Sequence, residues 1–209
     1  MKKVIVLFAI SWKKNGYCVA GKDINTKEWI RPITEEGPVP AQQVKGLKLL
    51  DVVEIEVGKN IPNGHQIENY EMIENPWKKI ETLTKKNIAV FLDNPSNIWD
   101  VGEIKGKDRL TPQEITTGKI NNSLCLIHIN NFTVKYEKRE FDGRTKSKYY
   151  GLFQFKGVDY KLSITDPEFT KQFYKIGNYS LNDVIICISL AGIWEERNES
   201  YKLIAGVIQ

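Results

Sequence analysis

The 209-residue sequence has very little of the chemistry on which many enzymes depend. It contains only two histidines, His65 and His128, and three widely separated cysteines. No H-x-H, C-x-x-C or H-E-x-x-H spacing suits a zinc site, and no G-x-x-x-x-G-K-[ST], G-x-G-x-x-G or G-x-S-x-G motif occurs. The sequence therefore indicates no catalytic residue, no metal ligand set and no cofactor, and favours a protein that binds over one that catalyses.

Long hydrophobic runs are also absent, and no apolar segment approaches the ~20 residues that a membrane span needs. The apolar run near the N-terminus ends at Ser11 without a cleavage site for a signal peptide, so a buried strand explains it better. Cys18, Cys125 and Cys187 each lie in an apolar stretch, as buried reduced thiols do. We expect a cytoplasmic protein that makes no contact with a membrane.

What the chain does contain is typical of a folded protein with a substantial core. It is 41% hydrophobic and 27% charged, and its length allows one large domain or two small ones. The formal net charge is +4, and the isoelectric point is near 8.8. That mild basicity permits binding to a polyanion without requiring it.

Strand patterns dominate both ends of the chain. In the first half they cover residues 4–11, 17–24, 28–33 and 49–58, with a tight turn at Asn15-Gly16 and a strand end or edge at Pro32. In the second half they cover 123–130, 132–141, 148–157, 158–166, 183–192 and 201–208, with a turn at Asp142-Gly143 and a short helix within 166–177.

The middle of the chain has a different pattern. Pro76 precedes apolar residues at helical spacing (Trp77, Ile80 and Leu83), which predicts helix within 76–93. Residues 94–120 are rich in loop signals and are expected to form a connector.

The two halves of the chain resemble each other. Asp51 and Asp183 each precede a similar apolar strand, and "GKDINTKEWIRPIT" resembles "FKGVDYKLSITD" upstream of them. Five or six short strands per half is the element count of an oligonucleotide-binding (OB) barrel. The fold class predicted is therefore mainly β with minor α: two tandem OB-like β-barrels with a helical insertion, the first over residues 1–110 and the second over 111–209.

The opening residues also resemble a known family, the dual OB-containing domain family of prokaryotic defence systems. Its motif "S-x-K-x-G-G-x-C-x-A-G" is matched by Ser11, Lys13, Gly16, Cys18, Ala20 and Gly21, with Asn15 in place of the first glycine. Its "G-E-W-I-R-P" element is matched by residues 28–32, with Lys27 in place of the glycine. Asn15 tolerates the positive φ of that turn, so we expect the turn to form. The resemblance implies recognition of nucleic acid or a nucleotide and no shared catalytic residues.

Two groups of basic and aromatic residues fit such binding. In OB-type barrels aromatic rings stack on bases, while lysine and arginine contact phosphates. The first candidate group is Lys13, Lys14, Tyr17, Lys22, Trp29 and Arg31. The second candidate group is Lys135, Lys138, Arg139, Arg144, Lys146, Lys148 and Tyr149. Two structural alternatives stand beside this interpretation. In one, Trp29 belongs to the core and Arg31 pairs with Glu28 or Asp23; in the other, the lysines of the second group protect an edge strand from aggregation.

The function predicted is non-catalytic nucleic-acid binding as a recognition component of a bacterial defence system. Three alternatives remain. One is a sensor of a small nucleotide or second messenger, in which Trp29 and Arg31 line a closed pocket. Another is a metal-dependent nuclease that uses the acids of strand 49–58, Asp51, Glu54 and Glu56. The third is an adaptor that binds another protein of a defence system.

Overall fold

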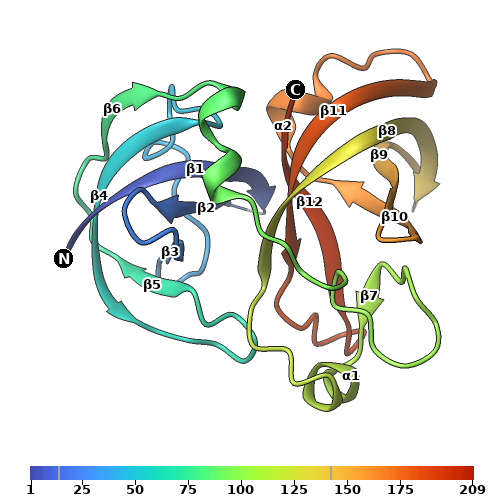
Figure 1. The fold of residues 1–209 in the computed structure, drawn as a ribbon, viewed down its shortest axis with the longest axis horizontal. Coiled ribbons are helices and arrows are strands. Elements are labelled where there is room, and N and C mark those ends of the chain that lie inside the picture. Colours follow the sequence, from blue (N-terminus) through green and yellow to red (C-terminus); the bar gives the residue numbers. More distant parts are fainter. Residues whose placement is uncertain (14, 142) are drawn as a thin grey trace.

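The computed structural model describes residues 1–13, 15–141 and 143–209, and it shows two β-barrels side by side (Figure 1). The first barrel contains β1 Lys2–Lys13, β2 Gly16–Asp23, β3 Trp29–Ile33, β4 Asp51–Asn60 and β5 Asn69–Met72. The second barrel contains β8 Leu124–Phe141, β9 Arg144–Phe155, β10 Val158–Ile164, β11 Gly177–Leu190 and β12 Ser200–Ile208. The structure thus confirms a mainly β protein.

Both barrels close in the same order. In the first, β1 pairs with β2 and β4, β2 with β3, β3 with β5 in parallel, and β5 with β4. In the second, β8 pairs with β9 and β11, β9 with β10, β10 with β12 in parallel, and β12 with β11. The five strands of each half therefore form a ring in which the third and fifth strands are parallel, as expected for an OB barrel.

The tight turns follow from residues that accept a positive φ. Asn15 has φ 69° and Lys27 has φ 63°. These are the two positions at which the family motif has glycine, the residue that adopts this conformation without a steric cost. The turn expected at Asn15-Gly16 is therefore present, whereas Asp142 of the second predicted turn lies outside the described residues.

The segment 76–93 is not the helix that its spacing predicted. Residues Lys78–Thr82 form strand β6, which pairs with β4, and only two 3₁₀ turns follow it, Lys85–Asn87 and Ala89–Phe91. Ile80, one of the predicted apolar helix positions, is 51% exposed. Backbone hydrogen-bonding groups on the free edge of β4 pair with this segment and stabilise it as a sixth strand. This tertiary pairing outweighs the weak helical pattern of the segment.

The connector between the barrels packs on the second one. Within residues 94–120 the chain forms β7 Arg109–Leu110, which pairs with β12, and one short helix, α1 Pro112–Thr117. Ile98, Trp99 and Leu110 belong to the core of the second barrel. The division into domains at residue 110 remains a prediction. Strand β7 lies on the N-terminal side of that division, although it pairs with the second sheet.

A shared apolar core joins the two barrels. It brings Phe8 and Phe91 of the first half together with Leu126, Cys187 and Ala205 of the second. At Gly206 of β12 an added Cβ would lie 2.2 Å from the carbonyl oxygen of Phe8, so only glycine permits this approach of β12 to β1. The two barrels therefore pack as one continuous body.

Candidate functional site

The outer face of β2 and β3 in the first barrel is covered by the second barrel. OB barrels commonly bind ligands on the face of their second and third strands. Here that face carries Lys22 and Arg31, which are 3% and 7% exposed. The side chains that the sequence analysis assigned to phosphate contacts on this face are therefore enclosed between the barrels.

Lys22 is held by groups of the chain itself. Its Nζ lies 2.8 Å from the carbonyl oxygen of Phe91 and 2.5 Å from Asp93 Oδ1. The same ammonium lies 4.9 Å from the centre of the Trp29 ring, and Trp29 Nε1 donates to Asp93 Oδ2 at 3.2 Å. Asp93 also accepts from the backbone N–H of Leu126. Lys22 and Trp29 thus help to join the barrels, which is the structural alternative considered for Trp29.

Arg31 lies in a second network between the barrels. Its Nη2 is 3.0 Å from Glu68 Oε1 and donates to Ser123 Oγ at 2.9 Å and to Ser189 Oγ at 3.3 Å. Glu68 is 6% exposed. Its partner is thus Glu68, from the loop before β5, and neither Glu28 nor Asp23. A substitution of Arg31 therefore tests how the barrels are held together rather than a phosphate contact.

The corresponding face of the second barrel is open and basic. Side chains of directly paired residues share a face of the sheet, and the pairs here are Lys135 with Tyr150, Glu137 with Lys148, and Arg139 with Lys146. On β10, Lys161 and Ser163 lie beside Leu152 and Tyr150. We name this surface the basic face; its cationic and aromatic residues are Lys135, Arg139, Arg144, Lys146, Lys148, Tyr150 and Lys161.

Tyr150 lies at the centre of the basic face. Lys161 Nζ is 4.6 Å from the centre of its ring, and the Arg139 guanidinium is 5.6 Å away. Among the described residues on the hairpin's outer side, Glu137 is the one acid, and hydrogen bonds from Lys135 and then Arg139 lower its pKa. An aromatic ring surrounded by cations can stack on a base while its neighbours contact phosphates.

Two residues of the second candidate group lie on the opposite side of this hairpin. Tyr149 stacks on the buried Tyr136 with ring centres 4.6 Å apart, and its hydroxyl donates to the carbonyl oxygen of Phe173. Lys138 pairs with Ser147, on the same side as Tyr149. Strand alternation therefore gives Tyr150 the outward position that the sequence analysis assigned to Tyr149. Sequence reasoning also missed Lys161, and its alternation with the core residues Tyr160 and Leu162 was the available signal.

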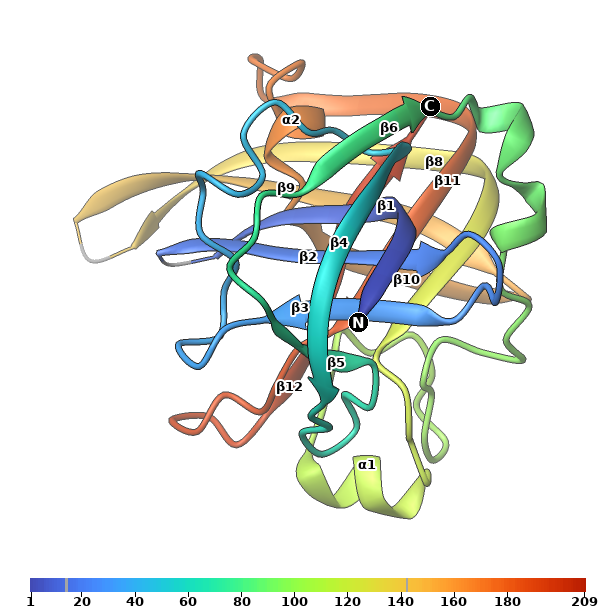
Figure 2. The same ribbon diagram turned by 90° about the vertical axis from the view of Figure 1, so that its left-hand side faces the viewer.

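The tip of the β1–β2 hairpin lies near the basic face. The backbone N–H of Trp12 donates to the carbonyl oxygen of Thr165, just beyond β10, and Ser11 Oγ donates to Thr165 Oγ1 at 2.7 Å. Figure 2 shows the β1–β2 and β8–β9 hairpins projecting toward the same side of the molecule. Trp12 is 64% exposed and Lys13 is exposed, whereas Lys14 lies outside the described residues.

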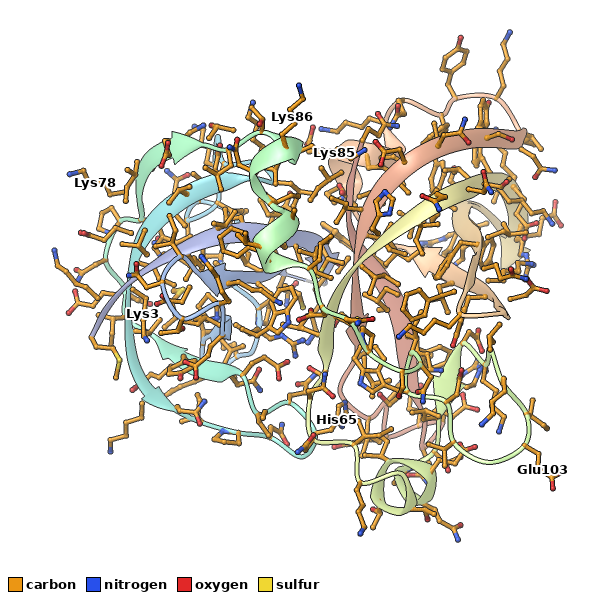
Figure 3. The ribbon with its side chains drawn as sticks, in the orientation of Figure 1. Lys3, His65, Lys78, Lys85, Lys86 and Glu103 are labelled. Carbon is orange, nitrogen blue, oxygen red and sulfur yellow. The ribbon has the colours of Figure 1, made fainter. Side chains whose placement is uncertain are left out.

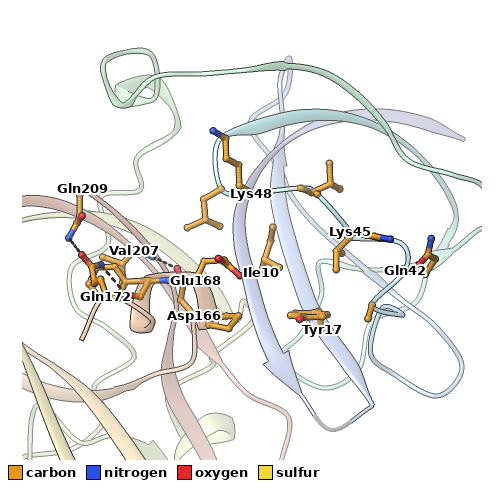
Figure 4. A pocket seen from close by; sticks show the side chains of 17 residues that line it. Ile10, Tyr17, Gln42, Lys45, Lys48, Asp166, Glu168, Gln172, Val207 and Gln209 are labelled. Atoms are coloured by element: carbon orange, nitrogen blue, oxygen red, sulfur yellow. Dashed lines mark hydrogen bonds between the residues drawn. The ribbon is translucent and has the colours of Figure 1, made fainter. Parts of the chain in front are cut away.

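Two of the cavities between the barrels differ in character. The larger, of about 710 Å³, separates the loop 41–49 from the short helix α2 Pro167–Thr170 (Figure 4). Tyr17 lines it, so Tyr17 does not contribute to the open basic face. Its buried acid, Asp166, accepts from the backbone N–H groups of Phe169 and Val207. Burial raises the pKa of Asp166, and its two acceptor bonds serve the chain's own backbone.

The second cavity, of about 340 Å³, we name the inter-barrel cleft. Trp12, Lys13 and Cys18 line it from the first barrel, and Ser189 and Gly192 line it from the second. Arg31 and Asn69 line it as well. Trp29 lines a separate cavity beside Asp93, so Trp29 and Arg31 do not share one pocket.

The acids considered for a nuclease have structural partners. Asp51 is fully buried and accepts from Thr82 Oγ1, from Lys79 Nζ and from the backbone N–H of Lys48. Glu54 pairs with Lys2, and Glu56 accepts from Asn75. Within residues 1–13, 15–141 and 143–209, no group of three or more His, Cys, Asp or Glu side chains is placed to hold a metal ion.

The fold and these surfaces define the class of protein: two fused OB barrels, one with its ligand-binding face covered and one with it open. The sequence model of the dual OB-containing domain matches residues 3–207, so the chain belongs to this family. OB-containing domains commonly bind nucleic acids. No curated protein matches the chain, and no helix of the described residues is long and apolar enough to cross a membrane.

Proposed function

We propose that the protein binds single-stranded nucleic acid without catalysis, on the basic face of its second barrel. The observation that carries this proposal is that five of the six basic residues predicted in the second group lie on the same face of the hairpin as Tyr150, and that Lys161 and Arg139 lie close to its ring. The recognition of a strand by an OB barrel combines such a ring with a positively charged track. Trp12 and Lys13 extend the surface toward the first barrel.

The proposal includes a role as a recognition component of a prokaryotic defence system in the cytoplasm. The family membership supports this part, since the sequence resemblance implies that association. A protein partner from the same system is compatible with it. Among the described residues of the first group, Lys13 remains exposed; it lies with the exposed Trp12 at the end of the β1–β2 hairpin, which projects toward the same side as the β8–β9 hairpin (Figure 2).

The test is the salt dependence of binding by a charge variant of the basic face. Lys148→Ala/Lys161→Ala removes two exposed cations near Tyr150. Each lost phosphate contact should reduce the slope of log K against log salt by about 0.7–0.9. Fluorescence anisotropy with labelled DNA and RNA oligomers, between about 50 and 200 mM salt, measures this slope and identifies the preferred polymer.

A matched control removes the same charge from the first barrel. Lys78 and Lys86 are exposed there and neither belongs to the basic face; Lys78 lies on the side remote from the second barrel, and Lys86 lies next to Lys85 (Figure 3). Lys78→Ala/Lys86→Ala should leave the slope unchanged. Equal slopes in both double variants, or no binding by the unaltered protein at the lowest salt, would contradict the proposal.

A further inference from the structure

The inter-barrel cleft contains a buried polar group that the protein itself does not satisfy. Asn69 is 2% exposed, and its Oδ1 has no hydrogen-bond partner among the described residues. Leaving a buried acceptor unpaired is unfavourable. Asn69 lines the cleft at the start of β5, next to Glu68. A ligand whose N–H group donates to an unpaired acceptor on a cavity wall gains affinity from that hydrogen bond.

The polar groups next to Asn69, around its strand partner Arg31, are already occupied. The carboxylate of Glu68 and the hydroxyl groups of Ser123 and Ser189 all bond to Arg31. The arginine and glutamate charges compensate each other, and the other cation of the lining is Lys13. What remains available is the neutral carboxamide of Asn69, which can present both an acceptor and a donor.

The mouth of the cleft carries a large exposed aromatic ring. Trp12 lines the cleft and is 64% exposed, although tryptophan is normally well buried. An indole at the mouth and a carboxamide on the wall are complementary to a flat, polar ring. The volume of about 340 Å³ lies at the lower end of the range of about 300–1,000 Å³ for small-molecule pockets.

We propose that the inter-barrel cleft binds one nucleobase, with the Asn69 carboxamide bonded to the base edge and Trp12 covering its face. Asparagine pairs with adenine through one acceptor and one donor, which makes an amino-bearing purine the best match. The base can belong to a free nucleoside or nucleotide, or to a strand bound on the adjacent basic face. In the second case the inference rests on the function proposed above.

Cys18 provides a readout inside the cleft. It is partly exposed and lines the cleft, whereas Cys125 and Cys187 are buried and burial raises the pKa of both thiols. A thiol reagent should therefore modify Cys18 first. A base that occupies the cleft should slow this modification, and mass spectrometry of the intact protein measures the rate.

The experiment uses the full chain with two kinds of probe. The first is the four nucleosides without phosphate, followed by calorimetry and by protection of Cys18. The second is an oligonucleotide and the same oligonucleotide with single abasic positions. If nucleosides protect Cys18, the ligand of the cleft is a free nucleoside or nucleotide. If the intact oligonucleotide protects Cys18 and an abasic position abolishes that protection, the ligand is a base of the bound strand. Protection by neither overturns the inference.

Substitutions separate the cleft from the basic face. Asn69→Leu should weaken base binding by about 5- to 150-fold, the span of one bidentate contact between an amide and a base. Because a change at a buried residue can affect folding, Trp12→Ala is the second variant, and it should also abolish protection of Cys18. Trp194→Ala is the matched control, since Trp194 is 46% exposed and does not line the cleft.

The two proposals fail in different ways. Salt-dependent binding of the oligonucleotide without protection of Cys18 overturns the proposal for the cleft and supports the proposal for the basic face. Protection of Cys18 by nucleosides, without binding of any oligomer at low salt, overturns the proposal for the basic face and supports the proposal for the cleft. Equal base affinity in Asn69→Leu and the unaltered protein overturns the assignment of the carboxamide.

Discussion

At the scale of single residues, one step along a strand separates a tyrosine of the core from a tyrosine on the outer face. Tyr149 and Tyr150 are adjacent, yet Tyr149 packs on Tyr136 inside the barrel and Tyr150 faces outward beside Lys161. Their sequence context is nearly the same, with lysines before both. The difference comes from register, because successive side chains of a strand point to opposite faces.

The acid within the basic face provides a prediction at this scale. Glu137 is ion-paired with Lys135 at 2.8 Å and with Arg139. Glu137→Gln should release both cations and tighten binding of nucleic acid by about 2- to 5-fold, which is the size of a surface ion pair. Fluorescence anisotropy at low salt measures the gain. The control Glu140→Gln, on the other side of the same strand, should give a smaller gain in affinity. Weaker binding by Glu137→Gln would refute the basic face as the binding surface.

At the scale of elements, β6 shows how a local pattern yields to a tertiary contact. The apolar spacing of 76–93 is helical, but β4 offers an unpaired edge and a buried anchor. Asp51 supplies that anchor through bonds to Thr82 and Lys79, which both belong to the β4–β6 ladder. Nothing in the spacing of the segment reports an acceptor some 30 positions away, so sequence reasoning could not find this strand.

Removal of that anchor should loosen β6 specifically. We expect Asp51→Ala to lower the free energy of unfolding by about 1–3 kcal/mol, because the donors to this buried carboxylate lose their partner. Hydrogen exchange should accelerate most in Lys78–Thr82. Glu81→Ala, an exposed change on the same strand, should leave exchange unchanged. Unaltered exchange in Asp51→Ala would show that β6 does not depend on this carboxylate.

At the scale of the whole molecule, the contact between the barrels includes a titratable group. His65 is 5% exposed, lies between the two halves (Figure 3), and its Nε2 is 2.9 Å from the carbonyl oxygen of Ala191. Burial lowers its pKa below the ordinary value of 6.5, so the ring is neutral in the folded protein. The contact is therefore formed by a neutral imidazole that donates to a carbonyl.

This burial predicts a pH dependence of stability. Because the pKa of His65 is lower in the folded protein than in the unfolded chain, the unfolded chain binds more protons near pH 6. The contribution of His65 to the free energy of unfolding is therefore full above about pH 7 and is lost as the pH falls through the folded pKa. The slope can reach about 1.4 kcal/mol per pH unit. Urea unfolding between pH 7.5 and 5 measures it. His65→Gln should flatten the slope and His128→Gln should retain it; an unchanged slope in His65→Gln would exclude His65 as the cause.

The sequence by itself determined the class of fold, the turns and the composition of the basic hairpin. Alternating apolar residues, the residues of positive φ at Asn15 and Lys27, and the lysines and tyrosines of 135–150 all act locally, so their effect can be read along the chain. The family match over residues 3–207 agrees with that reading.

Only the tertiary structure decided which of the two equivalent OB faces is open. Lys22 and Arg31 have the composition of a binding surface, but Asp93, Glu68, Ser123 and Ser189 bind them from segments far along the chain. Burial of an apolar core between the barrels brings those partners into place, and this burial depends on the packing of both halves at once. The same packing leaves the second barrel's face exposed and encloses the cleft with Asn69 on its wall.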